Sequence, residues 1–206
     1  MPKIVDREAR RQAVADAVLR VAAREGLEHA SLRNVAEEAG LAVGSVRHYF
    51  DDHSELMLFA MGELSRSIGD RCRAHVQRLL DAPRPGGSRR ADVERLLAEF
   101  LPLDDERREE AALWLAFTTA ARLRPALRRH ADELHAAMDD LLTRVLDGAR
   151  RAGRVAEDAD LPVEVRRLSA LLDGLTVQAV AQPGRVTPEA MRQVLRRHLE
   201  SLVTAA

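Results

Sequence analysis

The chain has 206 residues, of which 46% are hydrophobic and 32% charged, and its formal net charge at pH 7 is −1. This length is enough for a substantial core in one or two domains. Aromatic residues make up only 3%, and Ala, Leu and Arg dominate, so we expect an aliphatic, all-α fold. No apolar run approaches the roughly 18 residues that span a bilayer, which argues against a membrane partner.

The sequence is typical of a cytoplasmic protein. Residues 1–6 are too short and polar for a secretory signal. Cys72 is the only cysteine, which excludes an intrachain disulfide and fits a reducing compartment. A redox-sensing role for Cys72 is the alternative to ordinary packing, and packing is the commoner role of a lone helical cysteine.

Apolar periodicity and Gly/Pro punctuation predict about nine helices. The first covers residues 7–24 and ends at Gly26. Residues 82–88 (APRPGGS) read as a loop. Two short helices lie within residues 31–50, and we expect the others over residues 54–80, 90–100, 104–123, 126–152, 162–182 and 187–203.

Residues 31–50, SLRNVAEEAGLAVGSVRHYF, predict two short helices joined by a tight turn. Ser31 is suited to cap the first helix through its hydroxyl. Gly40 stands where a helix ends with positive φ, which glycine adopts without steric cost. Four residues make an apolar stripe on the first helix: Leu32, Val35, Ala36 and Ala39. The pattern predicts a helix-turn-helix, a DNA-binding unit.

The second helix of this pair has an inner and an outer face. Val46 and Phe50 share a face at spacing i, i+4 and should point inward. The residues left on the outer face are Val43, Ser45, Arg47 and His48. An outward arginine suits the major groove, because its guanidinium can donate twice to guanine O6 and N7. An ordinary helical hairpin is the alternative.

The overall charge of the N-terminal residues does not favour DNA binding, but local groups of basic residues do. Residues 1–53 hold eight basic and nine acidic residues. The basic ones gather at Lys3, Arg7, Arg10 and Arg11 and on the motif helices. Such a local basic stripe is enough for phosphate contacts, although a solvated charged face would look the same.

The motif resembles the DNA-binding element of the TetR family of transcriptional regulators. The matching residues are Ser31, Val35, Ala36, Ala39, Gly40, Leu41, Gly44, Tyr49 and Phe50. Three residues depart from the family pattern: Ala42 replaces a capping Ser or Thr, Arg47 replaces a Tyr, and His53 replaces a frequent Lys that contacts the DNA backbone. A histidine would be a weaker, pH-sensitive substitute.

The resemblance and the outward face together predict the DNA contacts. We expect base contacts from Arg47, His48, Ser45 and Val43. Phosphate contacts, which set the register on the duplex, are expected from Tyr49, Arg33 and His53. Gly44 completes the DNA-binding set.

The resemblance also implies the domain organisation and a homodimer. Residues 1–53 form the DNA-binding domain, residues 54–80 a connecting helix, and residues 54–206 together a regulatory and dimerisation domain. Residues 171–191 resemble the betaine-regulator (BetI-type) branch of the family. In the family the last two helices pair with those of a second copy, and the predicted interface comprises Leu168, Leu171, Leu172, Leu175, Leu195, Leu199 and Leu202. These leucines also fit the core of one subunit.

A small-molecule site is the remaining expectation. Large apolar residues with a few polar ones describe such a pocket, and in the family this bundle usually binds an inducer. The candidates are Phe100, Trp114, Phe117, Thr118, Met138 and Gln178. An aromatic stripe at helical spacing is equally an ordinary core.

The function expected is that of a dimeric repressor on a palindromic operator in double-stranded DNA, released by a small-molecule effector. A ligand-independent or activating regulator of the same fold is the alternative. A helical interaction module or an enzyme is more remote. His130, Glu133 and His135 are the only His/acid cluster, and no metal, phosphate-loop or nucleophile motif accompanies them. We therefore expect no enzyme activity, no cofactor and no metal.

Overall fold

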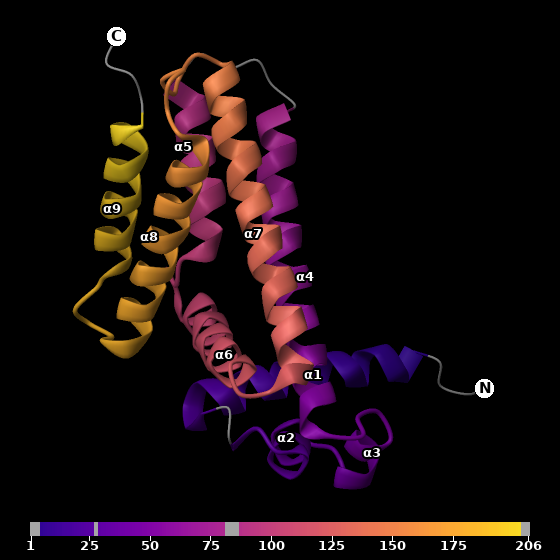
Figure 1. Cartoon of the computed structure of the whole chain (residues 1–206). Coiled ribbons are helices and arrows are strands. Elements are labelled where there is room, and N and C mark those ends of the chain that lie inside the picture. The colour runs from indigo at the N-terminus through magenta and orange to yellow at the C-terminus, as the bar shows by residue number, and fades with distance from the viewer. Residues whose placement is uncertain (1–4, 27–28, 81–86, 203–206) are drawn as a thin grey trace. The chain divides into compact units, whose positions relative to one another are not determined.

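The structure, a computed structural model, describes residues 5–26, 29–80 and 87–202 (Figure 1). These residues form nine α-helices and include the short 3-10 helix η2. The elements are α1 Val5–Glu25, α2 Leu32–Glu38, α3 Val43–Arg47, α4 His53–Leu80, α5 Gly87–Leu97, η2 Ala98–Phe100, α6 Asp105–Ala121, α7 Pro125–Arg151, α8 Leu161–Ala181 and α9 Pro188–Ser201. The predicted all-α class is confirmed.

One predicted helix ends earlier than expected. The sequence predicted a single helix over residues 90–100, but α5 ends at Leu97 and η2 follows it. The cause is Pro102, because a proline disfavours the helical conformation in the residue before it. Leu101 is accordingly extended, with φ −109° and ψ 141°. Of the expected loop, residues 82–86 lie outside the described residues, and residues 87–88 begin α5.

The chain forms two compact units. The first combines residues 1–67 with residues 109–132, and the second combines residues 68–108 with residues 133–206. Three long helices, α4, α6 and α7, each contribute to both units. These units are defined by packing. The predicted boundary after residue 53 instead separates a DNA-binding from a regulatory function, and it stays a prediction.

The second unit has one aliphatic core. It is built on α8 and α9, whose inward residues Leu168, Met191 and Leu195 are fully buried. Leu142 and Leu146 of α7 and the segment around Leu101 complete it. The burial of these aliphatic side chains is the main favourable term holding the unit together.

The starts of α8 and α9 follow the expected capping rules. The Thr187 hydroxyl accepts from the backbone N–H of Ala190 at 3.2 Å, with Pro188 at the first helical position. Asp160 caps α8 in the same way, accepting from the N–H of Val163 at 3.3 Å. Each cap satisfies a donor that a helix start otherwise leaves free.

None of the helices formed by the described residues is long and apolar enough to cross a membrane.

Replacing Leu168 by Ala should destabilise the protein strongly. Leu168 is 0% exposed in the core of the second unit, so Leu168→Ala removes buried apolar surface and leaves a cavity. We expect the free energy of unfolding to fall by about 2–5 kcal/mol. Urea denaturation followed by circular dichroism measures the change. Val163→Ala, on the same helix but at a 49% exposed position, is the control and should change stability by less than about 0.5 kcal/mol. Equal effects of the two substitutions would contradict this core assignment.

Candidate nucleic-acid interface

Helix α2 begins and ends as its sequence predicts. The Ser31 hydroxyl accepts from the backbone N–H of Asn34 at 3.2 Å, which caps the helix. Gly40 has φ +67°, and the N–H of Leu41 donates to the carbonyl of Ala36 at 2.8 Å. This left-handed residue followed by a bond back into the helix closes α2 tightly. Of the predicted stripe, Val35 and Ala36 are fully buried, whereas Leu32 and Ala39 are half-buried.

Helix α3 is only five residues long and is oriented by two buried side chains. Val46 is 0% and Phe50 1% exposed. Arg47 and His48 are exposed, while Val43 and Ser45 are half-buried. The prediction that all four face outward is therefore right for the arginine and the histidine and only partly right for the other two. As expected from Ala42, no side chain caps this helix.

An arginine from α1 covers the aromatic side chains behind α3. The rings of Phe50 and Phe59 lie 5.1 Å apart between centroids. The guanidinium carbon of Arg11 lies 4.6 Å from the Phe59 centroid and 5.9 Å from that of Phe50. A cation over aromatic faces is attracted by the ring quadrupole. Arg11 thus ties α1 to the end of α3 and the start of α4, a role that the sequence reading, which placed it in a phosphate-binding cluster, missed.

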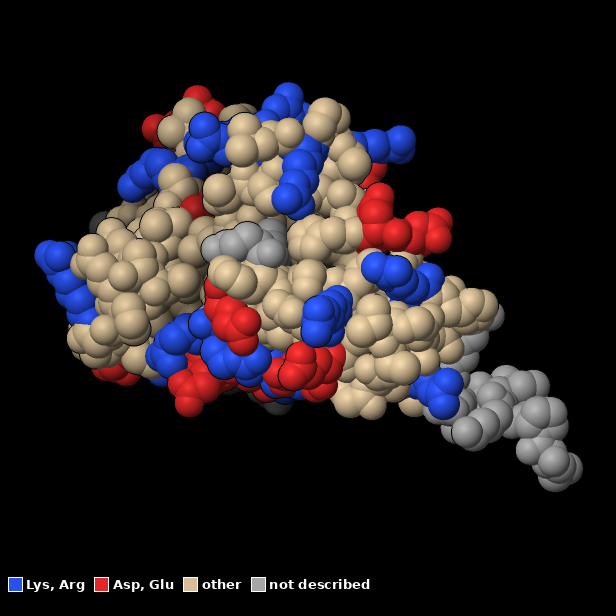
Figure 2. All heavy atoms as spheres, turned by 90° about the horizontal axis from the view of Figure 1, so that it is seen from below, with Lys and Arg blue, Asp and Glu red and all other residues tan. Residues whose placement is uncertain are grey.

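Other basic residues of this unit are held by a carboxylate. Arg20 Nε donates to Glu38 at 2.7 Å, and Arg24 Nη2 donates to the same carboxylate at 3.0 Å. These hydrogen bonds, that of Arg20 first, hold the pKa of Glu38 below its usual range. Lys3 and the side chain of Arg7 lie outside the described residues. Seen from below, Lys and Arg side chains form several separate groups with Asp and Glu between them (Figure 2).

His53 begins α4 and is half-buried. Its Nδ1 lies 3.3 Å from Nη1 of Arg124, in the segment that joins α6 and α7. A guanidinium has donors only, so Nδ1 accepts and the imidazole is neutral in this arrangement. Nothing in the sequence pattern of the motif pointed to Arg124, because it lies 71 positions away.

Two family models match the sequence. Residues 14–58 match "Bacterial regulatory proteins, tetR family", and residues 89–204 match "BetI-type transcriptional repressor, C-terminal". The HTH-type transcriptional regulator PksA of Bacillus subtilis is 34% identical over 203 residues, which cover 98% of this chain and 94% of that protein. This chain belongs to the TetR family.

Solved structures agree with this family. A transcriptional regulator from Rhodococcus is 28% identical, with a TM-score of 0.77 over 93% of this chain and 95% of that one. A regulator from Saccharomonospora viridis in complex with choline has the same fold, with a TM-score of 0.83 and 22% identity over 97% of this chain and 100% of that one. The TetR-family chain is thus a helix-turn-helix transcriptional regulator, and its relatives are regulators rather than enzymes.

The predicted ligand residues of this TetR-family protein divide between the two units. Trp114, Phe117 and Thr118 belong to the first unit, and Phe100, Met138 and Gln178 to the second. Phe117 is fully buried, with its ring edge-to-face on His130 at 6.1 Å between centroids. The Thr118 hydroxyl donates within its own helix, to the carbonyls of Trp114 and Leu115.

In the second unit the candidates occupy different environments. Phe100 and Met138 pack against the aliphatic core, and Gln178 is exposed on α8. A shared pocket for all six residues stays a prediction.

The predicted interface leucines contribute to the core of the second unit. Leu168, Leu172, Leu175, Leu195 and Leu199 are buried there, and Leu171 and Leu202 pack against them half-buried. The exposed large apolar side chains of α8 and α9 are instead Val163, Val177 and Val194. The leucine-rich side of α8 is therefore covered by the core of its own chain. The opposite side of α8 is exposed.

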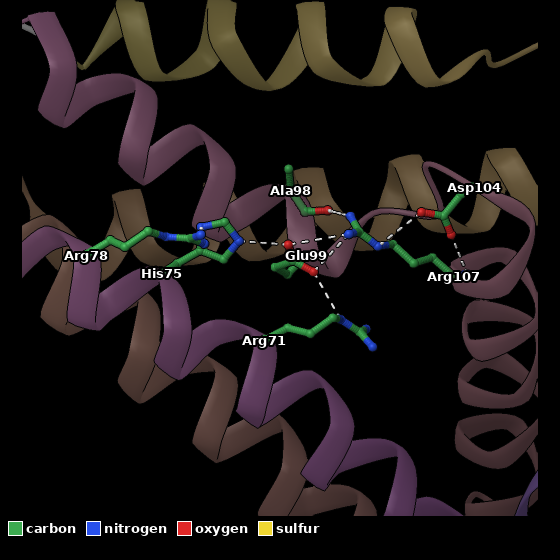
Figure 3. A network of polar contacts seen from close by, with 7 residues as sticks. All are labelled: Arg71, His75, Arg78, Ala98, Glu99, Asp104 and Arg107. Carbon is green, nitrogen blue, oxygen red and sulfur yellow. Dashed lines mark hydrogen bonds and ion pairs between the residues drawn. The ribbon is translucent and has the colours of Figure 1, made fainter.

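Glu99 is the centre of a buried ion-pair network in the second unit (Figure 3). Its carboxylate, 8% exposed, lies 3.0 Å from Arg71 Nε and 3.2 Å from Arg107 Nη2. His75 Nε2 lies 2.8 Å from its other oxygen. Arg78 donates to Nδ1 of His75 at 2.8 Å, so His75 carries its proton on Nε2 and donates to Glu99. One carboxylate thus joins α4, η2 and α6 (Figure 3).

Cys72 follows Arg71 in α4 and is buried. Burial, and secondarily the charge of Glu99, raises the pKa of its thiol to about 11. Since the thiolate is the reactive form, this thiol is unreactive at neutral pH. The packing role of Cys72 is the one that these surroundings favour.

Replacing Glu99 by Gln should destabilise the protein. Gln keeps hydrogen-bonding capacity but removes the charge that faces Arg71 and Arg107, whose side chains are only 25% and 24% exposed. We expect a loss of roughly 1–3 kcal/mol in the free energy of unfolding, because Arg71 and Arg107 then lose the buried negative charge that they share. Chemical denaturation measures it.

Asp140→Asn is the matched control for Glu99→Gln. Asp140 pairs with Arg144 at 3.1 Å, but both side chains are more than 60% exposed. Such a surface pair contributes little, so a change below about 0.5 kcal/mol is expected. A loss at Glu99→Gln no larger than that of the control would show that the network contributes nothing to stability.

Proposed function

We propose that this chain is a dimeric repressor that binds a palindromic operator and is released from it by a small-molecule effector. The observation that carries the proposal is the placement of Arg47 and the C-cap residue His48, which are exposed at the end of the recognition helix. Val46 in this helix and Phe50 just after it are buried and hold the helix in place. A side chain that must meet a base edge needs such a fixed support.

Arg47 and His48 are the base-reading residues in this proposal, with Ser45 and Val43 beside them. Arg47 would donate to guanine in the major groove. Arg33, Tyr49, His53 and Gly44 would position the helix on the backbone, which fixes register without reading sequence. The exposure of Arg33 supports its role, whereas the neutral, half-buried ring of His53 leaves it only a polar contact.

The proposed dimer uses the outer faces of α8 and α9. On α8, small or apolar residues recur along the side away from the core at Ala170, Gly174, Val177 and Ala181. On α9 the exposed Val194 lies beside the buried face that contains Leu195. Such faces let helices of two copies approach closely. Two-fold symmetry would set two recognition helices about 34–36 Å apart, one turn of DNA.

The effector in the proposal is a small organic molecule. Support comes from the fold neighbour from Saccharomonospora viridis, whose structure is a complex with choline, and from the match to a BetI-type repressor. An effector that favours the DNA-free state weakens DNA binding by a certain factor, and bound DNA must weaken the binding of the effector by the same factor.

Arg47→Ala should weaken and relax operator recognition. An operator is first selected by the protein from a pool of random duplexes, and affinity is then measured by fluorescence anisotropy over a salt series. If Arg47 reads guanine, its loss costs about 1–3 kcal/mol and removes the preference at one base pair of each half-site. Arg33→Ala is the control: as a phosphate contact it should weaken all sequences alike and lower the salt slope by about 1.

The base-reading role of Arg47 is refuted if Arg47→Ala leaves the preferences at every position unchanged. The wild-type protein tests the function itself, because binding that is neither selective nor salt-dependent contradicts a DNA-binding regulator.

Val177→Asp should dissociate the dimer. Val177 is 45% exposed on the outer face of α8, and a carboxylate there would be desolvated on association without a partner. Sedimentation equilibrium should show the dimer dissociation constant raised about tenfold or more. Leu123→Asp replaces a more exposed apolar side chain, 86%, outside these helices and should leave it unchanged. A Val177→Asp protein with the wild-type dimer constant would place the interface elsewhere.

A further inference from the structure

The connection from α6 to α7, together with the start of α7, carries a concentration of positive charge. Residues 122–129, RLRPALRR, contain four arginines and no acid, in a chain whose net charge is −1. All four arginine side chains are exposed. The segment belongs to the same compact unit as the recognition helix. It lies outside the helix-turn-helix motif, so the motif does not explain this cluster of arginines.

The turn is held in a defined conformation. The backbone N–H groups of Leu123 and Arg124 both donate to the carbonyl of Ala120 at 3.1 Å. The Arg128 guanidinium donates to the carbonyl of Arg122 at 2.8 Å. Leu127 is fully buried and anchors the first turn of α7. The arginines are therefore presented by a fixed scaffold, which lowers the entropy lost when they bind a partner.

Arg124 brings this charge to the start of α4. Its Nη1 lies 3.3 Å from Nδ1 of His53, the first residue of α4. Because Nδ1 accepts from a guanidinium, His53 itself brings no charge there. The formal positive charge at this point of the surface is that of Arg124, supplied by a distant part of the chain.

The neighbouring acids do not neutralise the turn. Asp51, Asp52 and Glu55 are exposed at the start of α4, where Asp52 accepts from the N–H of Glu55 at 2.9 Å and Glu55 from that of Asp51 at 2.7 Å. These carboxylates cap the helix. Over the described part of the chain, no ion pair joins Arg122, Arg124 or Arg128 to a carboxylate.

We propose that Arg124, together with Arg122 and Arg128, contacts the phosphate backbone of the bound DNA beside the recognition helix. The inference rests on the proposed function, since it presupposes that the head binds DNA. Exposed guanidinium groups without a carboxylate partner suit phosphate oxygens, which they bind with charge-assisted hydrogen bonds. Their place beside the first residue of α4, which follows α3 by a short connection, favours DNA over an acidic protein surface.

The test compares Arg124→Gln with the wild-type protein on the selected operator duplex, by anisotropy from low to high salt. Loss of one phosphate contact lowers the slope of log K against log[salt] by about 0.9 for each protomer bound, with affinity falling roughly fivefold to tenfold per contact at 0.1 M salt. Base preferences should not change, because a phosphate contact reads no sequence.

Two further variants sharpen this test. Gln at 124 can still donate to His53, so a merely structural role of the Arg124–His53 contact predicts wild-type binding for Arg124→Gln, whereas Arg124→Lys should retain most of the slope through its charge. Arg144→Gln is the matched control: it removes one exposed arginine from α7, paired with Asp140 in the second unit, and should leave the slope unchanged.

The outcomes separate this inference from the proposed function. A wild-type protein without selective, salt-dependent binding overturns both. In another outcome, the wild-type protein and Arg47→Ala behave as proposed while Arg124→Gln keeps the wild-type salt slope. In that case only the inference about the arginines of the turn is overturned. An equal slope change in Arg144→Gln would also overturn it, because the effect would then reflect net charge alone.

Discussion

The recognition helix α3 depends on burial for its existence. A helix of five residues is far too short to persist in water by itself, because nucleation costs more than so few hydrogen bonds return. It forms because Val46 and Phe50 are buried, Phe50 against Phe59 of α4, and because the Gly40 turn sets its direction. Arg11, stacked over Phe50 and Phe59, closes this small core from the side of α1. The orientation of Arg47 and His48 is therefore decided by buried residues and by Arg11 of α1 rather than by the short helix itself.

The charged side chains of this TetR-family protein form local groups. A net charge of −1 looks unfavourable for a DNA-binding protein, but Arg20 and Arg24 are held by Glu38, and Arg71 and Arg107 by Glu99. Arginines that are paired in this way hardly contribute to attraction for phosphate. Of the described residues, the exposed arginines that no carboxylate holds, among them Arg47, Arg122, Arg124 and Arg128, decide the field that approaching DNA meets.

The local features of the fold could be read from the sequence, whereas contacts between distant segments could not. The Ser31 cap, the Gly40 turn and the inward face of Val46 follow from rules that span a few residues, and the motif pattern identified the family. The Glu99 network joins residues 71, 75, 99 and 107, and Arg124 meets His53 across 71 positions. No periodicity encodes such encounters, because they arise only when helices pack. The split of the expected helix over residues 90–100 into α5 and η2 has a local cause instead, because Pro102 disfavours the helical conformation at Leu101.

The Glu99 network also constrains how this chain can evolve. A single substitution at 99 would remove the carboxylate that Arg71 and Arg107 share, whereas loss of one arginine leaves that carboxylate paired with the other. Sequence drift at these positions should therefore be asymmetric: an arginine is lost first and the carboxylate afterwards. Across relatives, positions 71, 99 and 107 are expected to vary as a correlated set, and this covariation would record the contact in lineages for which no structure exists.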